Sequence, residues 1–305
     1  MSNIVLSTEN LTKRFGEITA VKDLSIEIEQ GQVYGFLGPN GSGKTTTISL
    51  ILGLLTATSG KVNLFGEDWK SGSLRRMGVV MDLHGFYPNY SGLDNLLLFG
   101  EMLHPVDRNR IAEVLKLVGL ADRAQSKFRT YSMGMKQRLA VALALLDDPE
   151  FLILDEPTNG MDPEGIVEIR NLIIELNRQG KTILLASHLL SEVEQVCTHL
   201  AIMKKGVVVK QGALADLLDD NAATDTVFEI VTGNLPATTV LLQSLGYPVK
   251  QGRDRVLVSA SGDAAEKISA TLAGEKLFVT EMRRTTGSLE SVFIEATQQS
   301  KKNSG

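Results

Sequence analysis

The sequence predicts an α/β fold with an antiparallel β layer, followed by a small α+β domain of the ferredoxin-like type. The first two-thirds of the chain alternates short apolar runs with helical patterns, which is the organisation of α/β proteins. Residues 4–15 and 22–32 alternate polar and apolar side chains with a period of two, which indicates an antiparallel edge layer. The last third has the order of a βαββαβ unit.

Each element of the α/β part has its own signal. A buried strand at residues 32–38 is followed by a helix at 45–55, in which apolar residues recur at i, i+3, i+4 and i+7. Two fully apolar runs, 150–156 and 181–188, are typical of parallel strands that are buried on both faces. The segment between them, 165–180, is an amphipathic helix that ends at a glycine.

The polar stretch at residues 213–225 interrupts this pattern and predicts a linker. We therefore expect one domain at residues 1–220 and an accessory domain at 221–305. In the second domain the patterns run strand, helix, two strands, helix, strand and final helix, at residues 226–231, 237–245, 247–251, 255–260, 264–273, 276–282 and 289–297. This order predicts the split βαβ type of fold.

Composition limits the classes of function. The 305 residues carry a net charge of −5, which argues against a nucleic-acid partner. The single cysteine, Cys197, has no internal partner for a disulfide, so an oxidising compartment is not indicated. The N-terminus lacks signal-peptide order, and the apolar runs are shorter than the ~20 residues that span a bilayer. We expect a cytoplasmic chain whose membrane spans, if it works at a membrane, lie in another subunit.

The segment GPNGSGKT fits the phosphate-loop pattern G-x-x-x-x-G-K-[ST], with a predicted strand before it and a helix after it. Its glycines let successive backbone N–H groups and the helix N-terminus face an anion. Lys44 is expected to reach the β- and γ-phosphates, and the Thr45 hydroxyl to bind Mg²⁺. The residues expected to bind ATP here are Gly38, Pro39, Asn40, Gly41, Ser42, Gly43, Lys44, Thr45 and Thr46.

Two acidic residues follow the apolar run 150–154. Asp155 is expected to hold Mg²⁺, directly or through water, and Glu156 to take a proton from the attacking water. In isolation the pair also fits an ordinary solvated strand end. The phosphate loop makes the catalytic interpretation the favoured one.

The segment YSMGM predicts the start of another helix, with Ser132 as a good N-cap. Ser132 and Gly134 then lie at a helix N-terminus, which is a second phosphate-binding end. Taken alone, the segment fits an ordinary capped helix equally well.

Together these motifs resemble the ATP-binding subunit of an ABC transporter over roughly residues 4–215. Tyr131–Met135 matches the family signature, Asp155–Glu156 the second Walker motif, and Asp162 the acid of the D-loop. The resemblance implies a P-loop NTPase cassette with an antiparallel β layer and a helical signature subdomain. It also implies that Phe15 stacks on adenine and that His188 contacts the γ-phosphate. A core aromatic and a satisfied core histidine are the alternative interpretations of these two residues.

The family resemblance also implies partners. Two copies would pair head to tail, with each ATP held between one phosphate loop and the Ser132 and Gly134 of the other copy. An integral-membrane permease would convert closure and opening of this homodimer into transport, which places the chain at the cytoplasmic face of the membrane.

Asp82 takes the place of the family's Q-loop glutamine. A carboxylate is a stronger Mg²⁺ ligand than an amide oxygen, and an acid here resembles the subgroup that exports bacitracin, lantibiotics and related peptides. We expect Asp82 to complete the Mg²⁺ shell and to act in catalysis. The alternative is that Asp82 caps or solvates its loop.

Three functions are compatible with the sequence. The first is the ATPase subunit of an exporter for a peptide antibiotic, drug or lipid-like compound. The second is a soluble ABC ATPase of DNA repair or translation, which the short spacing from Lys44 to Ser132 and the single cassette disfavour. The third is an importer subunit whose C-terminal domain senses a ligand.

Overall fold

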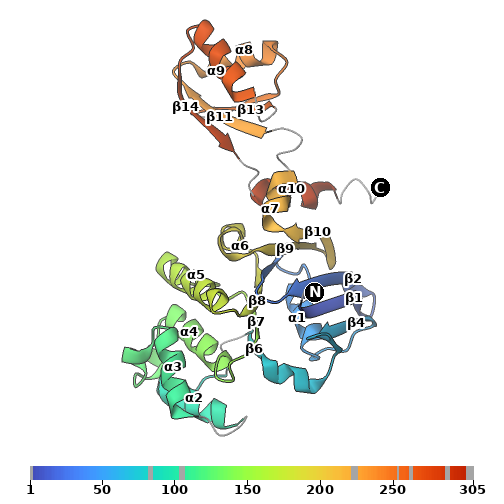
Figure 1. The fold of residues 1–305 in the computed structure, drawn as a ribbon, viewed down its shortest axis with the longest axis vertical. Coiled ribbons are helices and arrows are strands. Elements are labelled where there is room, and N and C mark those ends of the chain that lie inside the picture. The colour runs from blue at the N-terminus through green and yellow to red at the C-terminus, as the bar shows by residue number, and fades with distance from the viewer. Residues whose placement is uncertain are drawn as a thin grey trace. The chain divides into compact units, whose positions relative to one another are not determined.

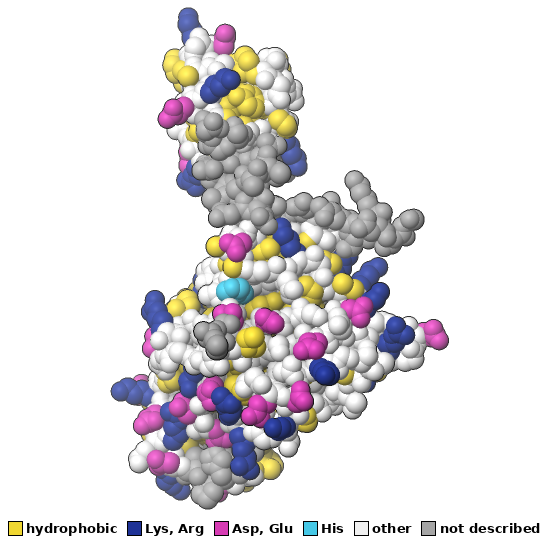
Figure 2. Space-filling view, turned by 45° about the vertical axis from the view of Figure 1, so that its right-hand side comes forward, with side chains coloured by type: hydrophobic (Ala, Val, Ile, Leu, Met, Phe, Trp, Pro, Cys, Tyr) yellow, Lys and Arg dark blue, Asp and Glu magenta, His cyan; other side chains and the backbone are white. Residues whose placement is uncertain are grey.

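The computed structural model describes residues 3–81, 85–102, 107–220, 226–252, 254–260, 264–285 and 289–299. The chain folds into two compact units, Met1–Gln211 and Gly212–Gly305 (Figure 1). No described helix is both long and apolar enough to cross a bilayer. On the face seen in Figure 2, Lys and Arg side chains are interspersed with Asp and Glu side chains.

The centre of the first unit is a six-stranded sheet in the order β10-β9-β3-β8-β7-β6. Strand β3 pairs in parallel with β8 and β9, and β7 pairs in parallel with β6 and β8. The strands are β3 Val33–Leu37, β6 Met77–Val80, β7 Phe151–Asp155, β8 Thr182–Ser187, β9 His199–Lys204 and β10 Val207–Ala213. Every residue of β3, β7 and β8 is buried, which confirms the prediction of central parallel strands.

A four-stranded sheet in the order β2-β1-β4-β5 covers one side of the unit (Figure 1). Its strands are β1 Ile4–Phe15, β2 Ile18–Glu29, β4 Ser59–Leu64 and β5 Glu67–Asp68, and the pairs are antiparallel. Leu6, Leu24 and Ile28 belong to a core that also includes Phe36 from β3 and Ile51 from α1. The predicted antiparallel layer is therefore confirmed.

Helices fill the rest of the first unit. They are α1 Lys44–Ile51, α2 Gly92–Glu101, α3 Arg108–Leu117, α4 Met133–Ala144, α5 Pro163–Arg178 and α6 Leu190–Val196. Figure 1 shows α2, α3 and α4 together on the side of the central sheet away from β1, β2 and β4. These three helices contact one another, and α4 also packs on β6. They form the helical subdomain that the family resemblance implies.

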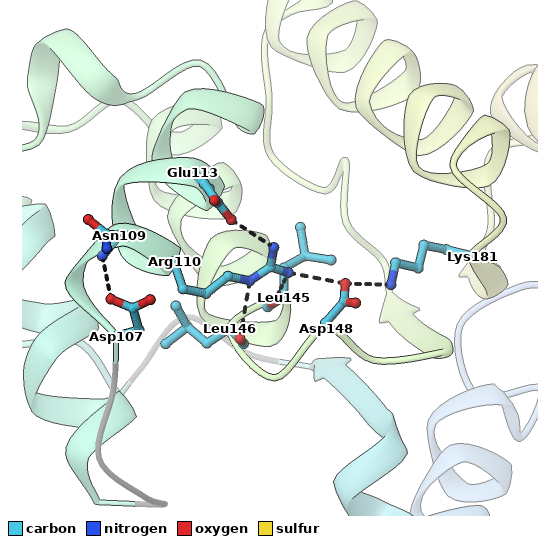
Figure 3. Close-up of polar contacts among 8 residues, drawn as sticks. All are labelled: Asp107, Asn109, Arg110, Glu113, Leu145, Leu146, Asp148 and Lys181. Atoms are coloured by element: carbon cyan, nitrogen blue, oxygen red, sulfur yellow. Dashed lines mark hydrogen bonds and ion pairs between the residues drawn. The ribbon is translucent and has the colours of Figure 1, made fainter.

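A polar cluster joins α3 to the end of α4 and to the central sheet (Figure 3). Arg110 donates to the carbonyls of Leu145 at 2.8 Å and Leu146 at 3.3 Å, and its guanidinium lies 3.2 Å from Asp148 Oδ1. Lys181, just before β8, donates to the same oxygen at 2.8 Å. Lys181, followed by Arg110, holds the pKa of Asp148 below its usual value.

The second unit begins with α7 Leu214–Asp220, which contacts α10 Leu289–Gln299. Between them lie β11 Thr226–Thr232, α8 Leu235–Ser244, β12 Val249–Gln251, β13 Val256–Ala260, α9 Ala264–Gly274 and β14 Val279–Thr285. The antiparallel sheet is ordered β12-β13-β11-β14, and its core includes Phe228, Ile230 and Leu272. The element order is the predicted βαββαβ plus a helix.

The two compact units divide after Gln211, whereas the sequence places the domain boundary after residue 220. The two boundaries differ by helix α7, which contacts α10, the last helix in the sequence of the second unit. Such a long-range contact leaves no local pattern in the polar stretch. The assignment of residues 221–305 as an accessory domain stays a prediction.

Candidate active site

A cavity of about 450 Å³ lies at the N-terminus of α1. Four segments form its walls: the start of β2, the loop from β3 into α1 with the first residues of α1, the end of β7, and the turn between β9 and β10. The lining residues are Ile18, Thr19, Ala20, Asn40, Gly41, Gly43, Lys44, Thr45, Thr46, Glu156, Lys205 and Gly206. Segments from both sheets therefore converge on the predicted phosphate loop.

The close packing of this loop requires glycine at two positions. Gly43, the residue before α1, has a φ of 108°, and a Cβ there would lie 2.7 Å from the carbonyl oxygen of Ala20. A Cβ on Gly38 would lie 2.5 Å from the carbonyl oxygen of Met203. Side chains at these positions would push the loop away from its neighbours, which would open the cradle of backbone N–H groups.

Lys44 lies inside the loop, with only 5% of its side chain exposed. Its ammonium group donates to the carbonyl of Gly38 at 2.7 Å and that of Pro39 at 3.4 Å, and it lies 3.2 Å from Glu156 Oε1. A buried cation requires partners of this kind, because desolvation otherwise disfavours the charge. Lys44 is thus fixed between the phosphate loop and the end of β7.

Thr45 and Asp155 form the oxygen-rich side of the site. The Thr45 hydroxyl donates to Asp155 Oδ2 at 2.7 Å, and Asp155 Oδ1 is buried without a hydrogen-bond partner in the described part of the chain. Burial raises the pKa of Asp155, and the hydrogen bond from Thr45 opposes this shift. The Thr45 hydroxyl and the Asp155 carboxylate, with its one unsatisfied buried oxygen, fit the preference of Mg²⁺ for oxygen ligands.

Asp155→Asn is expected to raise the melting temperature of the nucleotide-free protein by about 2 °C or more at pH 7. Because the pKa of Asp155 is higher in the folded than in the unfolded state, the ionised carboxylate destabilises the fold above its unfolded pKa. The gain should therefore disappear as the pH falls to about 4. Thermal denaturation at several pH values measures it.

Asp148→Asn is the matched control for this prediction. Lys181 and Arg110 lower the pKa of Asp148, so its carboxylate contributes stability at pH 7. The same substitution should therefore lower the melting temperature. If Asp155→Asn also lowered the melting temperature, the conclusion that the buried, ionised Asp155 carboxylate destabilises the fold would be wrong.

Glu156 contacts both Lys44 and His188. Its second oxygen, Oε2, lies 2.7 Å from His188 Nδ1, and its backbone N–H donates to the carbonyl of Ala186 at 2.9 Å. The backbone φ of Glu156 is 49°, which costs a residue other than glycine roughly 1–3 kcal/mol. Glu156 therefore stands at the end of β7 with its carboxylate between the Lys44 ammonium group and the His188 imidazole. This arrangement is suited to accepting a proton from a bound water.

The structure does not place every predicted residue in this cavity. Ser132 is the N-cap of α4 and accepts from Met135 N at 3.2 Å, as predicted, but neither Ser132 nor Gly134 is among the residues lining the cavity. Phe15 also lies outside that lining, and its ring is 48% exposed, so the alternative of a core aromatic is wrong. Asp82 lies outside the described residues.

Sequence reasoning missed the turn between β9 and β10. Gly206 N donates to the carbonyl of Ser42 at 2.9 Å, and Gly206 O accepts from Lys22 N at 2.8 Å. Gly206 therefore connects the phosphate loop to β2, and its neighbour Lys205 lines the same cavity. The segment KKG between two apolar runs has the composition of a turn, but its position beside the loop depends on the pairing of β3 with β9.

Comparison with known proteins agrees with this geometry. Residues 21–159 match the protein-family model described as ABC transporter. The ABC transporter ATP-binding protein YhcH of Bacillus subtilis (strain 168) is 39% identical over 302 residues, which cover 97% of each chain. The bacitracin transport ATP-binding protein BcrA of Bacillus licheniformis is 46% identical over 215 residues, or 69% of this chain and 70% of BcrA.

Among solved structures, cbiO1 from Clostridium perfringens, described as part of the ABC transporter complex cbiONQ, matches with a TM-score of 0.66. It is 26% identical and covers 80% of this chain and 98% of its own. The similarity to these proteins therefore extends over most of the chain. The chain belongs to the ATP-binding proteins of ABC transporters, ATPases that use ATP with Mg²⁺, act as dimers and work with a membrane permease.

Proposed function

We propose that the chain is the ATP-hydrolysing subunit of an exporter for a peptide antibiotic, drug or lipid-like compound. The observation that carries the hydrolytic part is the convergence of Lys44, Glu156 and His188 at the phosphate loop. The similarity to proteins named for bacitracin and lantibiotic transport supports the class of compound. The absence of a spanning helix among the described residues is compatible with peripheral attachment through the permease at the cytoplasmic face.

In this proposal each residue at the site has a defined role. Backbone N–H groups of the phosphate loop and Lys44 bind the phosphates, and Glu156 accepts the proton of the attacking water. His188 holds the Glu156 carboxylate through Nδ1 and contacts the γ-phosphate. Thr45 and Asp155 would hold Mg²⁺, which when bound neutralises charge on the phosphate oxygens.

A second copy of the chain completes the site. Ser132 and Gly134 lie at the N-terminus of α4, and we assign their contact with ATP to the nucleotide bound by a partner subunit, as the family resemblance implies. A head-to-tail pair brings this helix N-terminus to the nucleotide of the other copy, where its N–H groups favour an anion. ATP then stabilises the closed dimer, and hydrolysis reopens it.

Phe15→Ala is expected to weaken ATP binding by about 10-fold, because stacking on a base contributes roughly 1–3 kcal/mol. The exposed ring of Phe15, with Lys13 Nζ 5.0 Å from its centre, is available to a base. Titration with a fluorescent ATP analogue measures the affinity. Phe278→Ala, which removes an exposed ring from the second unit, is the matched control and should leave the affinity unchanged.

The proposed role of Asp82 rests on the sequence alone. If Asp82 completes the Mg²⁺ shell, Asp82→Ala should lower Mg²⁺-dependent hydrolysis much more than ATP binding. Equal loss of both, or of neither, would favour a carboxylate that only caps its loop.

Co-purification with a candidate membrane permease tests the whole proposal. The chain should fractionate with membranes only when the permease is present, and bacitracin or a lantibiotic should stimulate ATP hydrolysis of the complex in proteoliposomes. Hydrolysis that instead depends on a solute-binding protein would indicate an importer. Activity indifferent to the permease would indicate a soluble ABC ATPase.

A further inference from the structure

Arg138 joins three helices of the first unit. It lies on α4, and its Nη1 donates to the carbonyls of Val118 at 3.0 Å and Gly119 at 3.2 Å, at the end of α3. Its Nη2 lies 3.3 Å from Glu168 Oε2 on α5. The planar guanidinium suits this task, because its fixed fork of donors serves two directions at once.

The position of Arg138 is closely constrained. Only 14% of its side chain is exposed, and its Nε is buried without a hydrogen-bond partner within the described ranges. Gly119 has a φ of 67°, and a Cβ there would lie 2.9 Å from Arg138 Nη1. A left-handed residue without a side chain thus lets the guanidinium approach the end of α3. Leaving Nε unsatisfied costs free energy, so the contacts of the other two nitrogens must compensate.

The same helix pair is in close contact at its N-terminal ends. A Cβ on Gly134 would lie 3.6 Å from Gly165 Cα and 3.9 Å from Glu168 Oε2, so α4 packs directly on α5 there. Gly165 N in turn donates to Asp162 Oδ1 at 3.0 Å, which caps α5. The Ser132–Gly134 end of α4 and the Asp162 end of α5 are therefore adjacent, and Arg138–Glu168 fixes the helices about one turn further along.

We infer that Arg138, through Glu168, is a positioning residue that holds Ser132, Gly134 and Asp162 as one rigid block. The inference rests on the proposed dimer, in which this block meets the nucleotide bound by the second copy. A displacement of the two helix ends by about 1 Å would misplace their N–H groups relative to the phosphates, which can cost up to about 10²-fold in rate. In the proposed arrangement a single copy binds ATP through its own phosphate loop and Lys44, so the block acts only on the nucleotide of the second copy.

The test compares variants in a Glu156→Gln background, where ATP and Mg²⁺ should accumulate the closed dimer. Sedimentation velocity over a range of protein concentrations gives the dimer dissociation constant. Glu168→Gln should raise it by roughly 5- to 30-fold, because the helix ends of both copies are then no longer held in the geometry that meets the nucleotide and must be ordered when the symmetric dimer closes. Arg138→Lys, which keeps the charge but loses the fork, should act in the same direction. Affinity of dilute, monomeric protein for a fluorescent ATP analogue should change less than about twofold.

Glu192→Gln is the matched control. It breaks the Arg170–Glu192 pair, at 2.9 Å, which joins the same helix α5 to α6 rather than to α4. This control should lower the melting temperature without changing the dimer dissociation constant. The inference would be overturned if neither Glu168→Gln nor Arg138→Lys changed the dimer dissociation constant. It would also be overturned if Glu192→Gln changed that constant as much as they do. A Glu156→Gln parent that stays monomeric would instead overturn the proposed dimer, and the inference with it.

Discussion

Glu156→Gln is expected to lower kcat for ATP by about 10²–10⁴-fold while leaving ATP affinity largely intact. The amide has the size of the carboxylate, so its contact with His188 Nδ1, 2.7 Å away in the native protein, can persist in another protonation pattern. The amide group, unlike the carboxylate, cannot take a proton from water at neutral pH. Phosphate release in a steady-state assay measures kcat, and titration with a fluorescent ATP analogue measures affinity.

The same variant should form a stable dimer in ATP and Mg²⁺, because binding proceeds and the step that reopens the dimer is blocked. Light scattering after size-exclusion chromatography detects the change in mass. Glu150→Gln is the control, since it removes a carboxylate from an exposed pair with Arg76 on the edge of the same sheet. A Glu156→Gln protein that hydrolyses ATP at the native rate would exclude Glu156 as the base.

Lys44→Ala is expected to weaken ATP binding by roughly 10- to 150-fold, the equivalent of the 1.5–3 kcal/mol carried by a charged hydrogen bond. It should also destabilise the nucleotide-free protein by about 1–3 kcal/mol, because Glu156 Oε1 loses the ammonium group at 3.2 Å. Chemical denaturation measures stability. Trp69, whose Nε1 donates to the carbonyl of Ile51 at 2.9 Å at the end of α1, is an intrinsic fluorescent probe for this denaturation.

The double variant Lys44→Ala with Glu156→Gln separates the two effects. Removing both charges should restore most of the stability, since no unpaired carboxylate remains, but it should not restore ATP binding. Lys205→Ala is the control for loss of positive charge in the same cavity, and we expect a change of no more than about threefold in affinity. If Lys205→Ala weakened ATP binding as much as Lys44→Ala, the proposal that Lys44 is the main phosphate-binding lysine would be wrong.

The strands and the site motifs of the first unit were readable because their signals are local. The runs that became β7 and β8 are mostly apolar and are buried at every position, which is typical of strands in a parallel sheet covered on both faces. The Ser132 cap depends on a hydrogen bond three residues away. His188 and Phe15 were selected by resemblance, and the structure joins His188 to Glu156 but leaves Phe15 exposed beside the cavity lining.

The sequence by itself determined the strands and helices next to the motifs, the element order of the second unit, the glycine-rich phosphate loop and the acidic pair at the end of β7. Only the tertiary structure decided which side chains meet: Thr45 bonds Asp155 across 110 positions, Arg138 reaches α3 and α5, and α7 pairs with α10. The physical reason is the range of the forces that leave a pattern. Hydrophobic periodicity, capping and glycine conformations act within a few residues, whereas contacts between distant segments depend on how the sheets and helices pack.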